Sequence, residues 1–146
     1  MTSPSEGRVD LLKTVPALPV KNVAKAAAFY RDRLGFEIGH TDDSFGIVTR
    51  SGIEIHLWAA NDETWTRRTR ALASGPVVSG AESFLAGTAS CRIEVRGIDA
   101  LYAELKESGV LYASDTVIET MPWGTREFPA LDLERNLITF NERISD

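Results

Sequence analysis

Two stretches of the sequence space their apolar residues at the period of an α-helix. The first follows Asn22, a favourable N-cap residue, and stops at Gly35, whereas the second stops at Gly109. Glycine often ends a helix because it adopts a left-handed backbone conformation without strain. The apolar positions are Val23, Ala26, Ala27, Tyr30 and Leu34 in the first stretch, and Ile98, Leu101, Tyr102 and Leu105 in the second. The pattern predicts two amphipathic helices.

After each predicted helix, apolar and polar residues alternate as they do in half-buried strands. Residues 45–49 and 53–58 flank Arg50-Ser51-Gly52, which suits a tight hairpin turn. In the second half the candidate strands are residues 117–120, 126–131 and 137–141. A short β-prone run also precedes each helix, at Val20 and again at Val95. We therefore predict an α+β fold of two duplicated βαβββ modules, whose curved mixed sheets surround a cleft.

The 146 residues are expected to form one domain with an insertion between its modules. Module 1 spans about residues 12–60, the insertion about 61–88, and module 2 about 89–142. Residues 59–89 are long for a plain connection, and residues 62–73 are compatible with a short helix that carries Trp65. A solvated linker is the simpler interpretation, and a lid over the cleft with Trp65 inside is the alternative.

Strand alternation places polar and aromatic side chains on the sheet faces opposite the helices. In residues 53–58, Ile53, Ile55 and Leu57 are predicted to face the core, and Glu54, His56 and Trp58 the other side. In residues 90–95, Cys91, Ile93 and Val95 are predicted to face the core, and Ser90, Arg92 and Glu94 the other side. Such faces are either exposed to solvent or line a polar cavity, and the pattern fits both.

Charge and composition exclude several classes of function. The net charge of −5 disfavours nucleic acid and weakly favours a cationic partner. Cys91 is the one cysteine, so no internal disulfide forms, and no Cys/His spacing indicates zinc. Residues 1–9 lack the apolar stretch of a signal peptide, and no apolar run approaches the ~20 residues that span a bilayer. We expect a cytoplasmic protein with no membrane or nucleic-acid partner.

Candidate chemistry centres on a single tryptophan. Pro122 and Gly124 restrict the turn that holds Trp123 directly before a strand, so this side chain either folds onto the core or is covered by a ligand. His40 and His56 lie on different segments, and the sequence has neither a nucleophile elbow nor a phosphate-binding glycine loop. No catalytic constellation emerges from these residues.

Four segments resemble a known family. Residues 15–20 and 28–36 resemble the opening of the glyoxalase/bleomycin resistance/dioxygenase (vicinal oxygen chelate) superfamily, and residues 94–105 resemble the opening of its second module. The run Pro-Trp-Gly-x-Arg-Glu-Phe at 122–128, followed by Asp132 and Asn136-Leu137, is similar to the closing hairpin of the bleomycin resistance proteins. The resemblance implies paired βαβββ modules and a homodimer with two clefts between its subunits.

The resemblance also implies where a metal would bind in the enzymes of this superfamily. The four ligand positions correspond here to Val15, His56, Ser90 and Thr139. Only His56 is a strong ligand, because a valine does not coordinate and hydroxyl groups are poor substitutes for imidazole or carboxylate. The sequence therefore favours a protein without a metal or other cofactor, and without a catalytic step.

By this resemblance, we expect a protein that sequesters bleomycin- or phleomycin-like cationic glycopeptides, metal-free or copper-loaded. Aromatic faces would stack on the drug's flat rings, and carboxylates would meet its positive charge. The expected ligand-binding residues are Trp123, Phe45, Trp58, His56, Glu54, Arg92, Glu94 and Asp43, with Glu94 neutralising Arg92. Two alternatives stay open: a metal-dependent glyoxalase- or dioxygenase-type enzyme using His56, and a protein that binds another small aromatic molecule.

Overall fold

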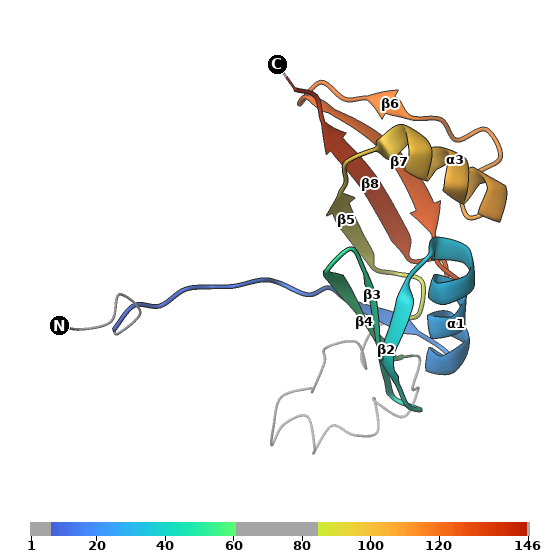
Figure 1. Ribbon diagram of the computed structural model, residues 1–146. Helices are drawn as coiled ribbons and strands as arrows, with labels where there is room; N and C mark the ends of the chain where they lie inside the picture. Colours follow the sequence, from blue (N-terminus) through green and yellow to red (C-terminus); the bar gives the residue numbers. More distant parts are fainter. Residues whose placement is uncertain (1–6, 61–84, 146) are drawn as a thin grey trace.

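The computed structural model describes residues 7–60 and 85–145, which form two four-stranded sheets, each covered by one helix (Figure 1). The first module comprises β1 (Ala17–Val20), α1 (Val23–Leu34), β2 (Glu37–Thr41), β3 (Phe45–Arg50) and β4 (Ile53–Ala59). The second comprises β5 (Ser90–Glu94), α3 (Ile98–Ser108), β6 (Glu119–Thr120), β7 (Thr125–Leu131) and β8 (Leu137–Arg143). The predicted order β-α-β-β-β is thus confirmed in both halves. The expected helix at 62–73, with Trp65, lies outside the described residues.

The two sheets have the same topology. Their strand orders are β1-β4-β3-β2 and β5-β8-β7-β6. In each sheet the first strand pairs in parallel with the last, and the other pairs are antiparallel. Both sheets are therefore mixed, as the predicted duplication requires. No helix in the described part of the chain is long and apolar enough to cross a membrane.

Both predicted helices begin and end where the sequence indicates. The side chain of Asn22 accepts a hydrogen bond of 2.9 Å from the backbone nitrogen of Lys25. Gly35 and Gly109 adopt φ values of 76° and 73°, which favour glycine at a helix end. The start of α3 lacks a side-chain cap of its own, and the carboxylate of Glu142 on β8 accepts from the nitrogen of Gly97 at 2.7 Å.

The predicted β3–β4 hairpin forms with a two-residue turn. Ser51 and Gly52 both have positive φ, 52° and 83°, which matches the twist of the adjoining strands. Ile55 and Leu57 are fully buried against the core as predicted. Ile53 is not: its side chain is 38% exposed, since it is the last paired residue beside the turn. Ile53 therefore shares the side of the sheet predicted for it, where it lines an apolar hollow between the modules, but it is not fully buried.

The strand predicted at 117–120 is shorter in the structure, where β6 comprises only Glu119–Thr120. Thr116 closes a local turn, because its hydroxyl accepts from the nitrogen of Ala113 at 2.8 Å. Its carbonyl oxygen accepts from the hydroxyl of Tyr102 at 2.6 Å. These two hydrogen bonds hold the backbone at Thr116 in a turn, so the strand begins only at Glu119. Val117, next to the turn, is exposed.

One hydrophobic core extends through both modules, and a buried polar network joins them. The hydroxyl of Tyr30 on α1 donates to the carboxylate of Asp132 at 2.9 Å. The side-chain amide of Asn136 donates to the same carboxylate at 3.0 Å and to the carbonyl of Pro19 at 2.9 Å. The core residues are Leu18, Val20, Val23, Ala26, Ala27, Tyr30, Leu34, Phe36, Val48, Ile55, Leu57, Ile98, Leu105, Val110, Phe128, Ala130, Ile138 and Phe140.

Residues 7–16 form an arm that precedes β1 and projects away from both sheets (Figure 1). Three of its apolar side chains are almost fully exposed: Leu11 is 97% exposed, and Val9 and Leu12 nearly as much. The arm contacts the body through an ion pair of 3.4 Å between Lys13 and Glu54, and the carbonyl of Pro16 accepts from the nitrogen of His56 at 3.0 Å. These three aliphatic side chains lie close together along one extended segment.

Candidate ligand-binding site

The side of the first sheet that faces away from α1, here called the first-module face, carries an aromatic cluster. Phe45 on β3 is paired in register with Trp58 on β4, and their ring centroids are 4.5 Å apart. The ring of His56 meets Phe45 edge-on, with centroids 5.0 Å apart. All three side chains are half-buried. Strand alternation therefore predicted correctly that Trp58 and His56 share this face.

The carboxylates near this cluster either have partners already or are exposed to solvent. Glu54 accepts a hydrogen bond from Nε2 of His56 and pairs with Lys13, and these two contacts, His56 first, lower the pKa of Glu54. Asp43, the other expected acid on this side, is exposed and makes no hydrogen bond or ion pair with the described residues. Asp42 beside it accepts from His40 at 2.7 Å and from the nitrogen of Phe45 at 2.9 Å. Asp42 thus fixes the loop that presents Phe45.

The side of the second sheet that faces away from α3, the second-module face, carries Trp123. The predicted turn forms: the nitrogen of Gly124 donates to the carbonyl of Met121 at 3.0 Å, and Gly124 has a φ of 94°. The indole is 64% exposed, so it does not fold back onto the core. Its Nε1–H donates to Glu127 at 3.0 Å.

Glu127 connects three side chains on the second-module face. It is only 3% exposed, and one of its oxygens, Oε2, accepts from Arg92, from the indole of Trp123, and from the hydroxyl of Thr125 at 2.6 Å. These bonds, that of Arg92 first, lower the pKa of Glu127 to about 2. Glu127 is therefore an ionised carboxylate at neutral pH, with the Arg92 guanidinium as its counter-charge.

The expected pairing of Arg92 with Glu94 is wrong. Glu94 forms an ion pair of 3.1 Å with Arg143, and both side chains are exposed. Arg92 pairs with Glu127 on β7, because β5 and β7 lie on either side of β8 in the sheet. The positive charge of Arg92 is thus neutralised by a residue that was not among the expected ligand-binding residues.

A hollow of about 520 Å³ lies on the second-module face and is named here the Trp123 hollow. Its charged lining residues are Arg92, Asp115, Glu119 and Glu127, and its aromatic ones are Tyr112 and Trp123. None of its lining residues comes from the first module. Within one chain, the structure therefore places the expected stacking residues on two separate faces, Phe45 and Trp58 on one and Trp123 on the other.

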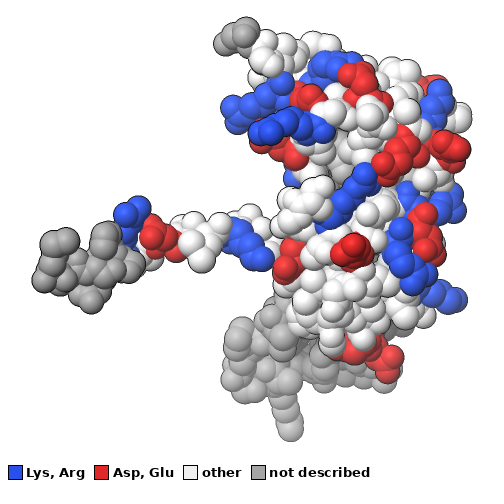
Figure 2. All heavy atoms as spheres, in the orientation of Figure 1, with Lys and Arg blue, Asp and Glu red and all other residues white. Residues whose placement is uncertain are grey.

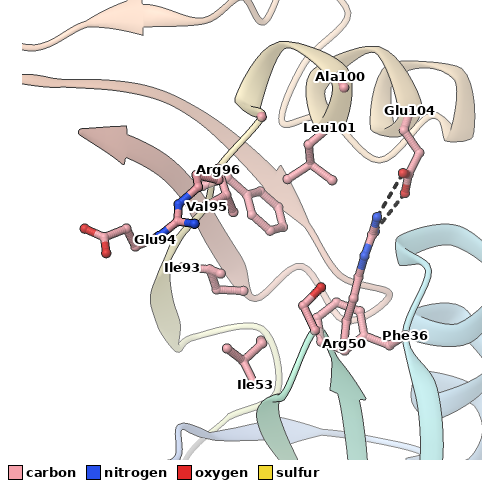
Figure 3. Close-up of a pocket in the computed structure, with 13 residues that line it drawn as sticks. Phe36, Arg50, Ile53, Ile93, Glu94, Val95, Arg96, Ala100, Leu101 and Glu104 are labelled. Carbon is pink, nitrogen blue, oxygen red and sulfur yellow. Dashed lines mark hydrogen bonds and ion pairs between the residues drawn. The ribbon is translucent and has the colours of Figure 1, made fainter. Parts of the chain in front are cut away.

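A second hollow, of about 470 Å³, lies where the two modules meet (Figure 3). Its apolar lining comes from both modules and comprises Phe36, Ile53, Ile93, Val95, Ala100, Leu101 and Phe140. On one side Arg50 holds Glu104 through two hydrogen bonds of 2.8 and 2.9 Å (Figure 3). Of the expected ligand-binding residues it includes only Glu94. It is separate from both aromatic faces.

The four positions compared with the metal-binding enzymes are not assembled into one cluster of strong ligands. His56 is bonded to Glu54, Val15 is half-buried, Ser90 is exposed and Thr139 lines the Trp123 hollow. Across residues 7–60 and 85–145, no group of three or more His, Cys, Asp or Glu side chains is arranged to hold a metal ion. Charged side chains of both signs are interspersed on the visible surface (Figure 2), so the net charge of −5 is not gathered into one acidic patch there.

Glu127 is the residue that sequence reasoning missed. Strand alternation along β7 could have identified it. Phe128 and Ala130 face the core, so Glu127, one residue before Phe128, points to the opposite side of the sheet. Its partner Arg92 is 35 residues away in the sequence, so the pairing itself depends on the sheet order.

The sequence profile described as the Glyoxalase/Bleomycin resistance protein/Dioxygenase superfamily matches residues 12–140. Bleomycin resistance proteins of Geobacillus stearothermophilus and of Staphylococcus aureus (strain N315) are each 45% identical over 134 residues, which is 92% of this chain and 98% of those proteins. The fold is similar to the crystal structure of the bleomycin-binding protein from bleomycin-producing Streptomyces verticillus, complexed with copper(II)-bleomycin. The TM-score is 0.69 and the sequence identity 26%, and the match covers 95% of this chain and all of that one. A bleomycin resistance determinant encoded on the transposon Tn5 shares the fold, with a TM-score of 0.65 and 21% identity over 91% of this chain and 98% of that one.

Proposed function

Because the chain belongs to the glyoxalase/bleomycin resistance protein/dioxygenase superfamily, we propose that it binds bleomycin-type glycopeptide antibiotics and protects by holding them without a chemical step. The observation that carries this proposal is the 45% identity with bleomycin resistance proteins over nearly their whole length. The exposed Trp123 and the Phe45–Trp58 pair add its physical basis, since each offers an aromatic surface to a flat ligand.

In this proposal, affinity comes mainly from stacking on the drug's flat bithiazole rings. Each well-placed aromatic contact contributes about 0.5–1.5 kcal/mol beyond the area it buries. Trp123 is exposed yet held by a hydrogen bond, so it is ready to stack without a large rearrangement. Phe45 and Trp58 already lie in contact with one another and offer a second aromatic surface.

We further propose that the protein is a homodimer, in which the first-module face of one subunit meets the second-module face of its partner. Two features support this arrangement. The stacking residues lie on different sheets of one chain, so a second copy is needed to enclose a flat ligand from both sides. The arm at residues 7–16 exposes Val9, Leu11 and Leu12, which contact with a partner would bury.

Charge also favours a cationic ligand. The Trp123 hollow has one basic lining residue, Arg92, and Glu127 pairs with it. Asp115 and Glu119 line the same hollow and make no ion pair with the described residues. With Arg92 neutralised, the remaining charge of the hollow is negative, which suits the positive tail of a bleomycin.

Isothermal titration calorimetry with metal-free bleomycin and with copper(II)-bleomycin tests the proposal. We expect saturable binding of about one drug per chain, with roughly submicromolar affinity. Drug recovered from the complex and analysed by mass spectrometry is expected to be chemically unchanged. No heat of binding with either form would refute the proposed ligand, and a modified drug would refute protection by holding alone.

A further inference from the structure

We propose that Glu127 is a positioning residue of the ligand-binding face: it holds the indole of Trp123 in one orientation and cancels the charge of Arg92. The part of this inference that concerns ligand affinity rests on the proposed function. The part that concerns the orientation of Trp123 does not depend on it.

The geometry supports this role because three donors converge on one carboxylate oxygen. Oε2 of Glu127 accepts from a residue of β5, from the turn before β7, and from β7 itself, namely Arg92, Trp123 and Thr125. Because these donors belong to two strands and a turn, the carboxylate has little freedom to rotate. A fixed acceptor in turn restrains the indole, because Nε1–H is its one hydrogen-bonding group and donates to Glu127.

Glu127 differs from the side chains that it holds in how far it is exposed to solvent. Glu127 is nearly inaccessible, whereas the side chains of Trp123 and Arg92 are each more than half exposed. A ligand on this face would therefore touch Trp123 and Arg92 rather than Oε2. Glu127 acts on the ligand through its neighbours, by reducing the freedom that Trp123 would lose on binding.

The charges that line the Trp123 hollow also support a positioning role for Glu127. Arg92 is the one basic residue that lines the Trp123 hollow, and without a counter-charge it would repel a cation. Because the pKa of Glu127 is lowered to about 2, the carboxylate remains ionised at every pH at which a drug would be bound. Because Glu127 and Arg92 neutralise one another, the net charge of the hollow is set by Asp115 and Glu119 and is negative.

Copper(II)-bleomycin titrations of Glu127→Gln and of the double variant Arg92→Gln/Glu127→Gln test the electrostatic part. We expect Glu127→Gln to weaken binding at least tenfold, because it leaves Arg92 uncompensated, and we expect the double variant to recover most of that loss. Glu107→Gln is the matched control, since it removes an equal charge from the exposed surface of α3 and should leave the affinity within about twofold of the unchanged protein.

Hydrogen exchange of the Trp123 indole proton, measured by NMR in the ligand-free protein, tests the positioning part. We expect the proton to exchange at least tenfold more slowly in the unchanged protein than in Glu127→Leu, which removes the acceptor. Equal exchange in both would overturn the positioning role. If Glu127→Gln binds as tightly as the unchanged protein, or if the double variant is as weak as the single one, the charge-cancelling role is overturned.

These outcomes separate the inference from the proposed function. If the unchanged protein fails to bind copper(II)-bleomycin, the proposed ligand is refuted, and the exchange of the Trp123 indole proton still decides whether Glu127 positions it. Thermal unfolding of every variant is measured alongside. A loss of affinity in Glu127→Gln that follows only from unfolding would count against the inference.

Discussion

The hydroxyl of Tyr30 lies 2.9 Å from the carboxylate of Asp132, 102 residues further along the chain, and both groups are buried. Tyr30 belongs to the helix of the first module, and Asp132 follows the last-but-one strand of the second. Burial raises the pKa of both groups, and the charge of Asp132 raises that of Tyr30 further. The proton therefore stays on the phenol, and the hydrogen bond joins the modules throughout the physiological pH range.

Replacing Tyr30 with phenylalanine is expected to destabilise the protein by about 1–3 kcal/mol, because a buried carboxylate loses a donor that water cannot replace. Urea unfolding followed by circular dichroism measures this change. Tyr112→Phe is the control: Tyr112 is exposed, so its unfolding free energy should change by no more than about 0.5 kcal/mol. Equal effects of the two substitutions would contradict the role given to the Tyr30–Asp132 bond.

Glu127 is expected to make stability depend on pH under acidic conditions. Its pKa is about 2 in the folded protein, below the ordinary value of 4.5, so its contribution is complete above pH 4.5 and is lost as the pH falls towards 2. The difference in unfolding free energy between the unchanged protein and Glu127→Gln should therefore shrink over that range. A difference that stays constant from pH 6 to about pH 2 would contradict the lowered pKa.

Trp123→Ala is expected to weaken bleomycin binding at least tenfold without unfolding the protein. The indole is mostly exposed, so its removal should cost no more than about 1 kcal/mol of stability, whereas a stacked ligand loses its aromatic partner. Calorimetric titration measures the affinity. Trp123→Phe keeps an aromatic ring and serves as the comparison, with a smaller loss. Unchanged affinity in Trp123→Ala would rule out stacking on this residue.

The double substitution Leu11→Asp/Leu12→Asp is expected to weaken the proposed homodimer at least tenfold, because it puts charges on the arm where a partner would bury apolar side chains. Sedimentation velocity over a range of concentrations measures the dissociation. Leu133→Asp places the same charge on an exposed leucine of the β7–β8 turn and should leave the assembly unchanged. A monomeric unchanged protein, or a variant that dimerises equally well, would exclude a role of the arm in dimerisation.

Local sequence signals predicted both helices and the β3–β4 hairpin, whereas β6 is shorter than the predicted strand and β2 was not located. Asn22 and Gly35 predicted the limits of α1, and the turn at Ser51-Gly52 predicted the β3–β4 hairpin, because caps and tight turns depend on only a few neighbouring residues. The exposure of Ile53 was not predictable in this way. Alternation assigns a residue to a side of the sheet and does not say how far the covering helix reaches.

The candidate site was predictable only in part, because its contacts join distant segments. Strand alternation placed His56 and Trp58 on one face correctly, whereas the pairing of Arg92 with Glu127 instead of Glu94 depends on β8 lying between β5 and β7. Nothing in the spacing along the chain specifies that order. The separation of Trp123 from Phe45 within one chain likewise follows from how the two modules pack.

The polar network around Asp132 also has an evolutionary consequence. Tyr30, Asp132 and Asn136 are buried between the modules, whereas Phe45, Trp58 and Trp123 lie on the opposite sides of the sheets and take no part in that network. Substitution of the mostly exposed Trp123 should therefore cost the folded state little. A duplicated scaffold of this kind can acquire new ligand preferences by changing a few exposed residues, provided that the buried polar residues that hold the two halves together stay unchanged.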